Sequence, residues 1–95
     1  MALFVLLTRL TDQGAKTIRD DPERILEVDG ELADMGVGVY HQYATLGRYD
    51  FVNIVEAPDN ETITRASMEI ASRGSVKIET LSALPIQEFI DAFKP

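Results

Sequence analysis

The sequence contains no cysteine and only one histidine among its 95 residues. The lack of cysteine excludes disulfides, thiolate nucleophiles, iron–sulfur clusters and thiolate zinc sites. The single histidine is His41, and neither a His-x-x-x-His nor an Asp-x-Asp pattern is present. A metal site built from carboxylates and one imidazole would therefore need a convergence that the spacing does not indicate. We expect no metal and no cofactor.

Basic residues and long apolar runs are also scarce. Nine Lys and Arg stand against 16 Asp and Glu, which gives a net charge of −7. Because nucleic-acid binding depends on clustered cationic side chains, this balance excludes nucleic acid as an expected partner. The run at the start, MALFVLL, is too short to span a bilayer and has no basic region before it. We therefore expect a cytoplasmic protein that does not bind membranes.

The length predicts a single domain over residues 1–95. At this size only about two-thirds of the unfolded surface can be buried, so the stability of an isolated chain is limited. Hydrophobic residues make up 45% of the chain and charged residues 26%, which is typical of a globular protein rather than a disordered one. Association with further copies would supply the burial that a chain of this length lacks.

Periodicity and helix-terminating residues predict the secondary structure. The residue preceding a proline avoids helical geometry, so Pro22 divides the first helical region into two helices. Thr11 or Asp12 is expected to cap the first helix, while Gly36 and Gly74 are placed to end later ones. The expected elements are a strand at 2–9, helices at about 12–20 and 22–35, strands at 37–46 and 50–57, a helix opening at Pro58 to Asn60 and ending at Gly74, a strand at 76–81 and a tail helix after Pro85.

This order of elements, βαββαβ, is typical of the ferredoxin-like α+β fold. Right-handed crossovers would place two helices on one face of a four-stranded antiparallel sheet, with the short C-terminal helix as an addition. The other face of the sheet would lack a helical cover. Its polarity therefore decides whether it contacts water, a ligand or a second subunit.

The second and third strands are predicted to form a hairpin whose turn is centred on Arg48 and Tyr49. This register pairs Leu46 with Phe51, Ala44 with Asn53, Gln42 with Val55 and His41 with Glu56. Alternation then places Val37, Val39, Val52, Ile54, Val76 and Ile78 on the helix side. The open face would carry Tyr40, Gln42, Ala44, Leu46, Phe51, Asn53, Val55, Lys77, Glu79 and Leu81. This face is too apolar for a surface that is exposed to solvent. We therefore expect the chain to associate with further copies as a homodimer or higher oligomer.

Two stretches of the sequence, GRYDFVNIVEAPDNETI and GSVKIETLSAL, resemble the GYD-domain family. The resemblance runs from the first strand to Leu84. It implies a fold similar to the dimeric α+β barrel group, and oligomerisation, but it implies no catalytic residues. The sequence departs from the Gly-Tyr-Asp turn of the family by an inserted residue, Arg48, between Gly47 and Tyr49.

Polar residues on the predicted open face are candidates for binding a small organic ligand between paired sheets. Once buried, such groups need partners, which come either from each other across the interface or from a ligand. In the turn, Gly47 is expected to allow a positive φ, and the Asp50 side chain is expected to accept hydrogen bonds from N–H groups of the turn. Arg48 and Tyr49 could instead form the rim of a pocket, where the guanidinium would hold an anion and the phenol would donate a hydrogen bond. The ligand-binding candidates are Tyr40, Gln42, Arg48, Tyr49, Asn53, Lys77 and Glu79.

His41 and Glu56 are the candidates for acid–base catalysis. An imidazole titrates near neutral pH, and a carboxylate on the opposite strand could orient it. The structural interpretation is a simple cross-strand contact, because no nucleophile is placed to complete a site. Three functions follow: a homo-oligomeric module with a ligand between its sheets; a cofactor-free enzyme similar in fold to antibiotic-biosynthesis-type monooxygenases; and a purely structural assembly unit.

Overall fold

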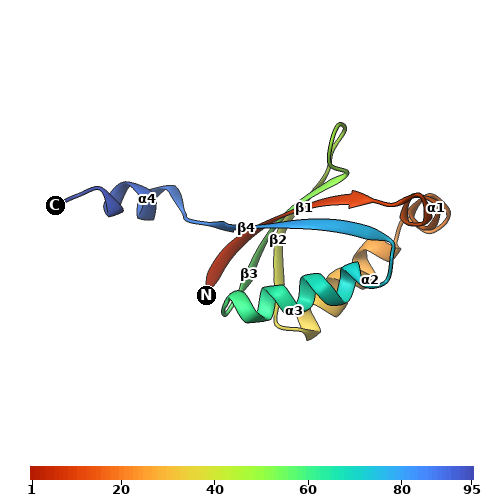
Figure 1. Ribbon diagram of the computed structural model, residues 1–95, viewed down its shortest axis with the longest axis horizontal. Helices are drawn as coiled ribbons and strands as arrows, with labels where there is room; N and C mark the ends of the chain where they lie inside the picture. The colour runs from red at the N-terminus through yellow and green to blue at the C-terminus, as the bar shows by residue number, and fades with distance from the viewer.

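The elements follow the order predicted from the sequence in a computed structural model that describes residues 1–95. The four strands form one antiparallel sheet with the order β2-β3-β1-β4. Helices α2 and α3 lie on the same side of this sheet (Figure 1). The ferredoxin-like α+β prediction is therefore confirmed. The elements are β1 (Ala2–Leu10), α1 (Asp12–Asp20), α2 (Arg24–Asp34), β2 (Gly38–Ala44), β3 (Phe51–Ala57), α3 (Asn60–Ala71), β4 (Val76–Ala83) and α4 (Ile86–Ala92).

The helices begin and end at the residues that the local chemistry selects. The Thr11 hydroxyl accepts a hydrogen bond from the Gly14 N–H at 3.1 Å and so caps α1. The carboxylate of Asp59 caps α3 in the same way, by accepting from the Thr62 N–H at 2.8 Å. The break at Pro22 separates α1 from α2, as predicted. After α2, Gly36 adopts a φ of 90°, a conformation that favours glycine.

The hydrophobic core lies between the helices and one face of the sheet. It is built from nine buried side chains: Phe4, Leu6, Leu32, Val37, Val55, Ala57, Ile63, Ala66 and Ile70. Three of the predicted helix-side residues, Val39, Val76 and Ile78, pack against this cluster, and Val37 belongs to it. Only 12 of the 95 residues are buried, so a large part of the apolar surface remains outside this core.

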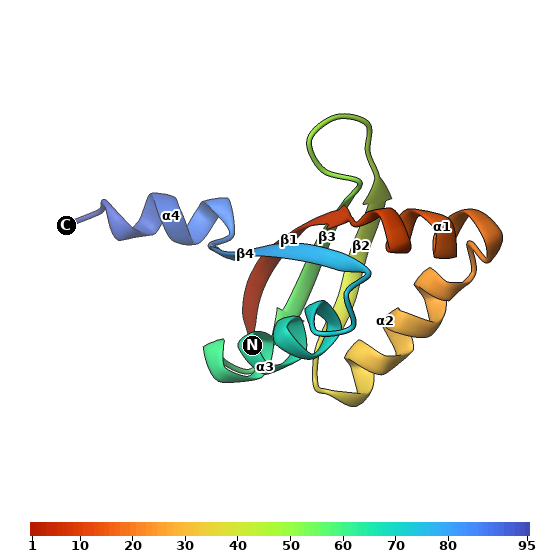
Figure 2. The same cartoon turned by 45° about the vertical axis from the view of Figure 1, so that its right-hand side comes forward.

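The predicted hairpin register is wrong. Strand β2 ends at Ala44 and β3 begins at Phe51, so residues 45–50 form a six-residue loop that projects from the sheet (Figure 2). Ala44 lies opposite Phe51, and Gln42 lies opposite Asn53. The pairing is also irregular between Val39 and His41, where a β-bulge inserts Tyr40.

This bulge reverses the faces assigned to part of the hairpin. It puts Val39 on the same side as Gln42, which strict alternation forbids. Strand β3 is apolar on both sides, so alternation alone could not distinguish its two faces. Val52 and Ile54 therefore belong to the open face and not to the helix side, whereas Gln42, Ala44, Phe51, Asn53 and Val55 face the helices. Tyr40, Lys77, Glu79 and Leu81 are on the open face as predicted, and Leu46 lies in the loop.

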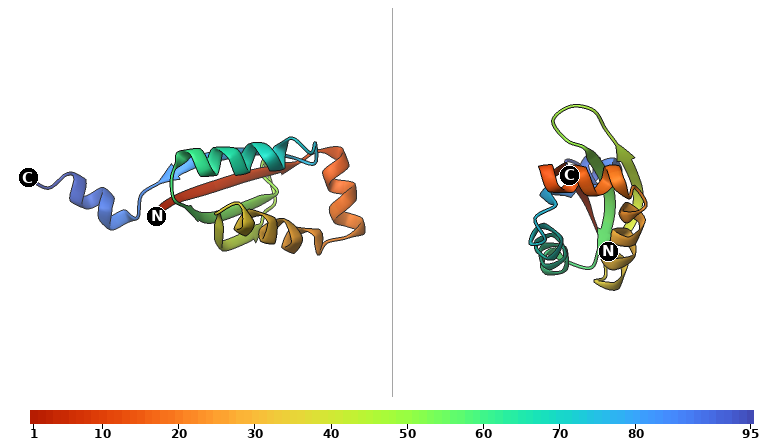
Figure 3. Two further views of the ribbon diagram at one scale, coloured as in Figure 1. Left: turned by 90° about the horizontal axis from the view of Figure 1, so that it is seen from below. Right: turned by 90° about the vertical axis from the view of Figure 1, so that its right-hand side faces the viewer.

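Helices α2 and α3 are spread apart, and α1 crosses one end of the gap between them (Figure 3). Helix α2 packs on β2, and α3 packs on β3 and β4. The start of α1 is tied to the segment before β4, because the Thr11 N–H donates to the Ser75 carbonyl at 3.0 Å and the Thr11 hydroxyl donates to the Gly74 carbonyl at 2.7 Å. Gly14 lies beside this junction, where a Cβ atom would approach the Ser75 oxygen to 1.9 Å.

Replacing Gly14 by alanine should therefore destabilise the fold by about 1–3 kcal/mol, the usual cost of forcing an extra carbon into a packed site. Gly30 in α2 is the matched control, since a Cβ there meets nothing within 4 Å. Gly30→Ala should stabilise the protein by up to about 1 kcal/mol, because alanine is the better helix former. Urea denaturation of the two variants checks this, and equal midpoints would contradict the close approach at Gly14.

Candidate functional site

The open face of the sheet is an uncovered apolar surface. Each strand contributes to it through the side chains that alternate with the helix-facing ones. No helix lies on this side of the sheet (Figure 1). Tyr43 and Leu81 are 58% and 46% exposed on it. Its apolar members are Leu3, Val5, Leu7, Tyr43, Val52, Ile54 and Leu81.

Charged and hydroxyl groups border this apolar surface. Arg9 and Lys77 are paired residues of β1 and β4, and Glu79 lies opposite Leu7. The Tyr49 hydroxyl donates to the Glu79 carboxylate at 2.9 Å, which ties the hairpin loop to β4. On the other side of the face, a hydrogen bond to Glu56 is the main cause that raises the pKa of the Tyr40 hydroxyl above its usual value. The open face thus has an apolar centre and a polar rim.

Helix α4 extends the exposed apolar surface. It follows β4 directly and points away from the sheet and the other helices (Figure 1). The rings of Phe89 and Phe93 contact each other at an angle of 59° with centroids 5.1 Å apart, yet the two residues are 50% and 77% exposed. Ile86 and Ile90 are exposed as well, and the spacing places all four side chains along one side of the helix.

The Gly-Arg-Tyr-Asp segment serves mainly to hold the hairpin loop on the sheet. The Asp50 carboxylate accepts the Leu10 N–H at 2.8 Å, and the Asp50 N–H donates to the Thr8 carbonyl at 2.8 Å. Asp50 was expected to bond within its own turn, but it fixes the loop to β1 instead. Gly47 has a φ of 124°, as its predicted role requires. Arg48 is exposed on the loop.

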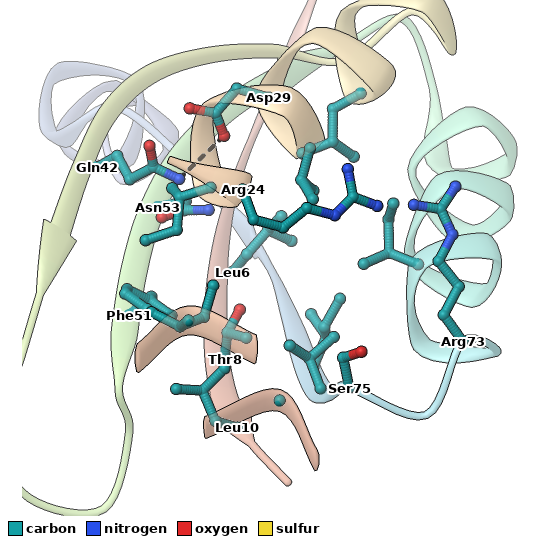
Figure 4. A pocket seen from close by; sticks show the side chains of 18 of the residues that line it. Leu6, Thr8, Leu10, Arg24, Asp29, Gln42, Phe51, Asn53, Arg73 and Ser75 are labelled. Carbon is teal, nitrogen blue, oxygen red and sulfur yellow. Dashed lines mark hydrogen bonds between the residues drawn. The ribbon is translucent and has the colours of Figure 1, made fainter. Parts of the chain in front are cut away.

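A cavity of about 120 Å³ lies on the other side of the sheet, beneath the gap between the helices. Its walls come from β1, β2, β3 and β4 and from α1, α2 and α3. Figure 4 shows Asp29 and Gln42 joined above Asn53, with Leu6 and Thr8 further along the sheet. Ten of the 20 lining residues are hydrophobic. The polar side chains come from separate elements.

Asn53 and Asp29 are two polar residues of this cavity whose side-chain oxygens have unused hydrogen-bonding capacity. Asn53 is only 7% exposed, and its Oδ1 atom has no hydrogen-bond partner. The Asp29 carboxylate accepts one hydrogen bond, from Gln42 Nε2 at 3.0 Å. Burial raises the pKa of Asp29 above its usual value, and the bond from Gln42 offsets this only in part. Both groups can accept further donors.

The structure divides the predicted ligand-binding residues between two surfaces. Gln42 and Asn53 line the cavity under the helices. Tyr40, Lys77 and Glu79 belong to the open face, with Tyr49 attached to it through Glu79. The seven residues therefore do not form one site.

The predicted acid–base candidates are not opposite each other. His41 lies opposite Ile54 and its ring is parallel to that of Tyr43, with centroids 6.5 Å apart. Glu56 lies opposite Gly38 instead. No group of three His, Asp or Glu side chains is close enough to hold a metal ion. No helix has the length and apolar character that a membrane span requires.

Sequence reasoning missed Asp29. It lies in α2, ahead of a glycine, and nothing in its immediate sequence distinguishes it from the other acidic residues of that helix. Its role arises from the packing of α2 on β2, which brings it to Gln42.

Comparisons with known proteins agree on the family and the fold. The GYD domain matches residues 4–93. A Thermus thermophilus protein named "Glutamine synthetase and cystathionine beta-lyase binding protein" is 54% identical over 95 residues, which cover 99% of this chain and 100% of that protein. A crystal structure of TTHA0845, also from Thermus thermophilus, superposes with a TM-score of 0.58 at 24% identity, over 90% of this chain and 95% of that one.

The role of Asp50 in the loop leads to a stability prediction. Asp50→Ala removes the acceptor of the Leu10 N–H and should lower the free energy of unfolding by about 1.5–3 kcal/mol, as expected for a bond to a charged group. Asp50→Asn retains an oxygen acceptor and should lose less than half of that. Urea denaturation measures both values, and an alanine variant as stable as the wild type would show that the bond contributes nothing.

Proposed function

Because the chain belongs to the GYD-domain family, we propose that it is a homodimeric protein-binding module whose partners include glutamine synthetase and cystathionine β-lyase. The observation that carries this proposal is the 54% identity to the Thermus thermophilus protein named for binding those two enzymes. The alignment covers both chains almost completely. The relative therefore has no additional domain that would account for its named binding.

The exposed surface supports association with a second copy. A compact monomer of 10.6 kDa exposes about 5,500 Å². This chain exposes 6451 Å², which is roughly 1,000 Å² more than that expectation. A stable interface hides about 800 Å² of each partner. The excess thus has the size of one half of a dimer interface, and the open face supplies apolar area where it would be hidden.

The charges of the open face favour a second copy over a highly charged partner. The whole chain carries −7, so two copies repel each other in general. The rim of the open face is different, because Arg9 and Lys77 balance Glu56 and Glu79. In a two-fold symmetric dimer, both copies contribute the same patch of surface to the interface. A rim with as many positive as negative charges can therefore form favourable contacts with the same rim of the second copy.

Helix α4 is the second element of the proposed interface. The radius of gyration is 14.4 Å, against about 12 Å for a compact chain of this length, because α4 lies apart from the rest. The helix continues β4, whose Leu81 and Ala83 already belong to the open face. Its apolar side is therefore continuous with the sheet surface and packs on the partner copy in the proposed dimer.

The wild-type chain should have twice its 10.6 kDa mass in solution, and Ile54→Lys should reduce it toward the monomer. A lysine in the middle of the open face would bury an unpaired charge in the dimer, which raises the dissociation constant at least tenfold, corresponding to about 1.4 kcal/mol. Leu26→Lys is the control, since Leu26 is 67% exposed on α2 away from this face. Light scattering across a dilution series measures the masses, and equal behaviour of the two variants would reject the open face as the interface.

Enzyme binding is tested by calorimetric titration of the purified chain into glutamine synthetase and cystathionine β-lyase from its own source. The Thermus thermophilus relative, titrated into its own two enzymes, is the positive control. We expect saturable binding to at least one of the enzymes in both systems. Binding by the relative together with none by this chain would contradict the proposed partners while leaving the dimer untouched.

A further inference from the structure

We propose that the cavity between the helices and the sheet is a binding site for a small organic cation, with its ammonium group held by Asp29 and Asn53 and its apolar part among the aliphatic walls. This site is separate from the open face, because it lies on the opposite side of the sheet. The proposal does not depend on the dimer or on the enzyme partners.

Asn53 provides the first reason. Its Oδ1 atom is fully enclosed and has no hydrogen-bond partner, although buried polar atoms are satisfied in the great majority of cases. Asn53 also lies in the middle of β3, paired to Leu6 on one side and Gln42 on the other. A hydrophobic side chain at this position would complete the core. An asparagine here costs stability unless a donor reaches it.

Asp29 provides the second reason. Its carboxylate lines the same cavity and forms no ion pair within the chain. Gln42 supplies its one hydrogen bond and orients it beside Asn53 (Figure 4). The Asp29 carboxylate on α2 and the Asn53 oxygen on β3 are therefore two hydrogen-bond acceptors, one of them charged. The chain supplies them with only one donor, Gln42. An ammonium group has three N–H donors and a positive charge. It would therefore supply both the missing hydrogen bonds and the missing counter-charge of Asp29.

The two arginines of the cavity do not reverse this charge preference. Arg24 is paired with Glu27 and Glu31, each at 2.9 Å. Arg73 is paired with Glu31 and, at 3.7 Å, with Glu69. Two guanidinium groups thus share three carboxylates. Asp29 is therefore the one charged residue of the cavity wall without a counter-ion, and it favours a cation beside it.

The size and walls of the cavity define the rest of the ligand. A volume of about 120 Å³ is close to that of an apolar cavity known to accept benzene, about 150 Å³. The walls include aliphatic side chains from every layer: Leu6, Ile25, Val28, Leu32, Ile70 and Ile78. The site therefore suits an amine that carries one ring or a short branched alkyl group.

Benzylammonium is the probe for this site, with benzyl alcohol as the neutral analogue and benzoate as the anion. Each is titrated into the full-length protein, and the backbone amide signals are followed by ¹H–¹⁵N NMR. We expect saturable shifts at Asp29, Gln42 and Asn53 with benzylammonium, and an affinity at least tenfold higher than that of benzyl alcohol, as for a charge-assisted hydrogen bond. Benzoate should not bind.

Asp29→Asn should reduce the benzylammonium affinity at least tenfold, while the matched control Asp34→Asn should not change it. Both substitutions remove one charge from α2, but Asp34 does not line the cavity. Asp29→Asn keeps an oxygen acceptor for Gln42 and removes a half-buried charge, so it should fold.

Absence of saturable benzylammonium shifts, or equal affinity for the alcohol, would overturn the proposal without any variant. Equal losses in the two variants would overturn the role of Asp29. The enzyme-binding titrations are independent of all these outcomes.

Discussion

Strand β1 imposes the constraint on which the rest of the structure depends. It pairs with β3 on one edge and β4 on the other, and it carries apolar side chains on both faces. Phe4 and Leu6 point to the helices and are buried, whereas Leu3, Val5 and Leu7 point to the opposite face. The chain has helices for only one of these faces. A central strand that is apolar on both faces is therefore the feature of the fold that most directly supports the proposed pairing with a second copy.

The two helices on the covered face leave part of the sheet between them without a helix packed directly on it, and the cavity lies there. Helix α2 packs on β2, and α3 packs on β3 and β4, so the centre of the sheet lies beneath a gap that α1 closes at one end (Figure 3). The polar groups Asn53 and Asp29 lie in this region rather than on the surface. The two proposals thus concern different faces of the sheet, with association proposed on the open side and small-molecule binding on the helix side.

Local chemistry made most of the fold predictable from the sequence. The cap at Thr11, the break at Pro22 and the left-handed Gly36 each act within a few residues, so the elements and their order followed correctly. The faces of the hairpin could not be predicted in the same way, because the bulge at Tyr40 changes the alternation and β3 is apolar on both sides. Gln42 and Asn53 were expected on the open face, where pairing with a second copy would bury them, but they lie on the helix side, where Asn53 is buried and Gln42 is half-buried. Asp29, the partner of Gln42, reaches this region through tertiary packing alone.

An intermolecular nuclear Overhauser experiment would detect the proposed contact between the open faces of two copies. Mixing uniformly ¹³C,¹⁵N-labelled chains with unlabelled ones allows contacts between copies to be separated from contacts within one copy. We expect intermolecular signals from the methyl groups of Val5, Leu7, Val52 and Ile54, which lie at the centre of the open face. Signals confined to the outer surfaces of α2 and α3, or none at concentrations where the open face should be fully paired, would contradict it.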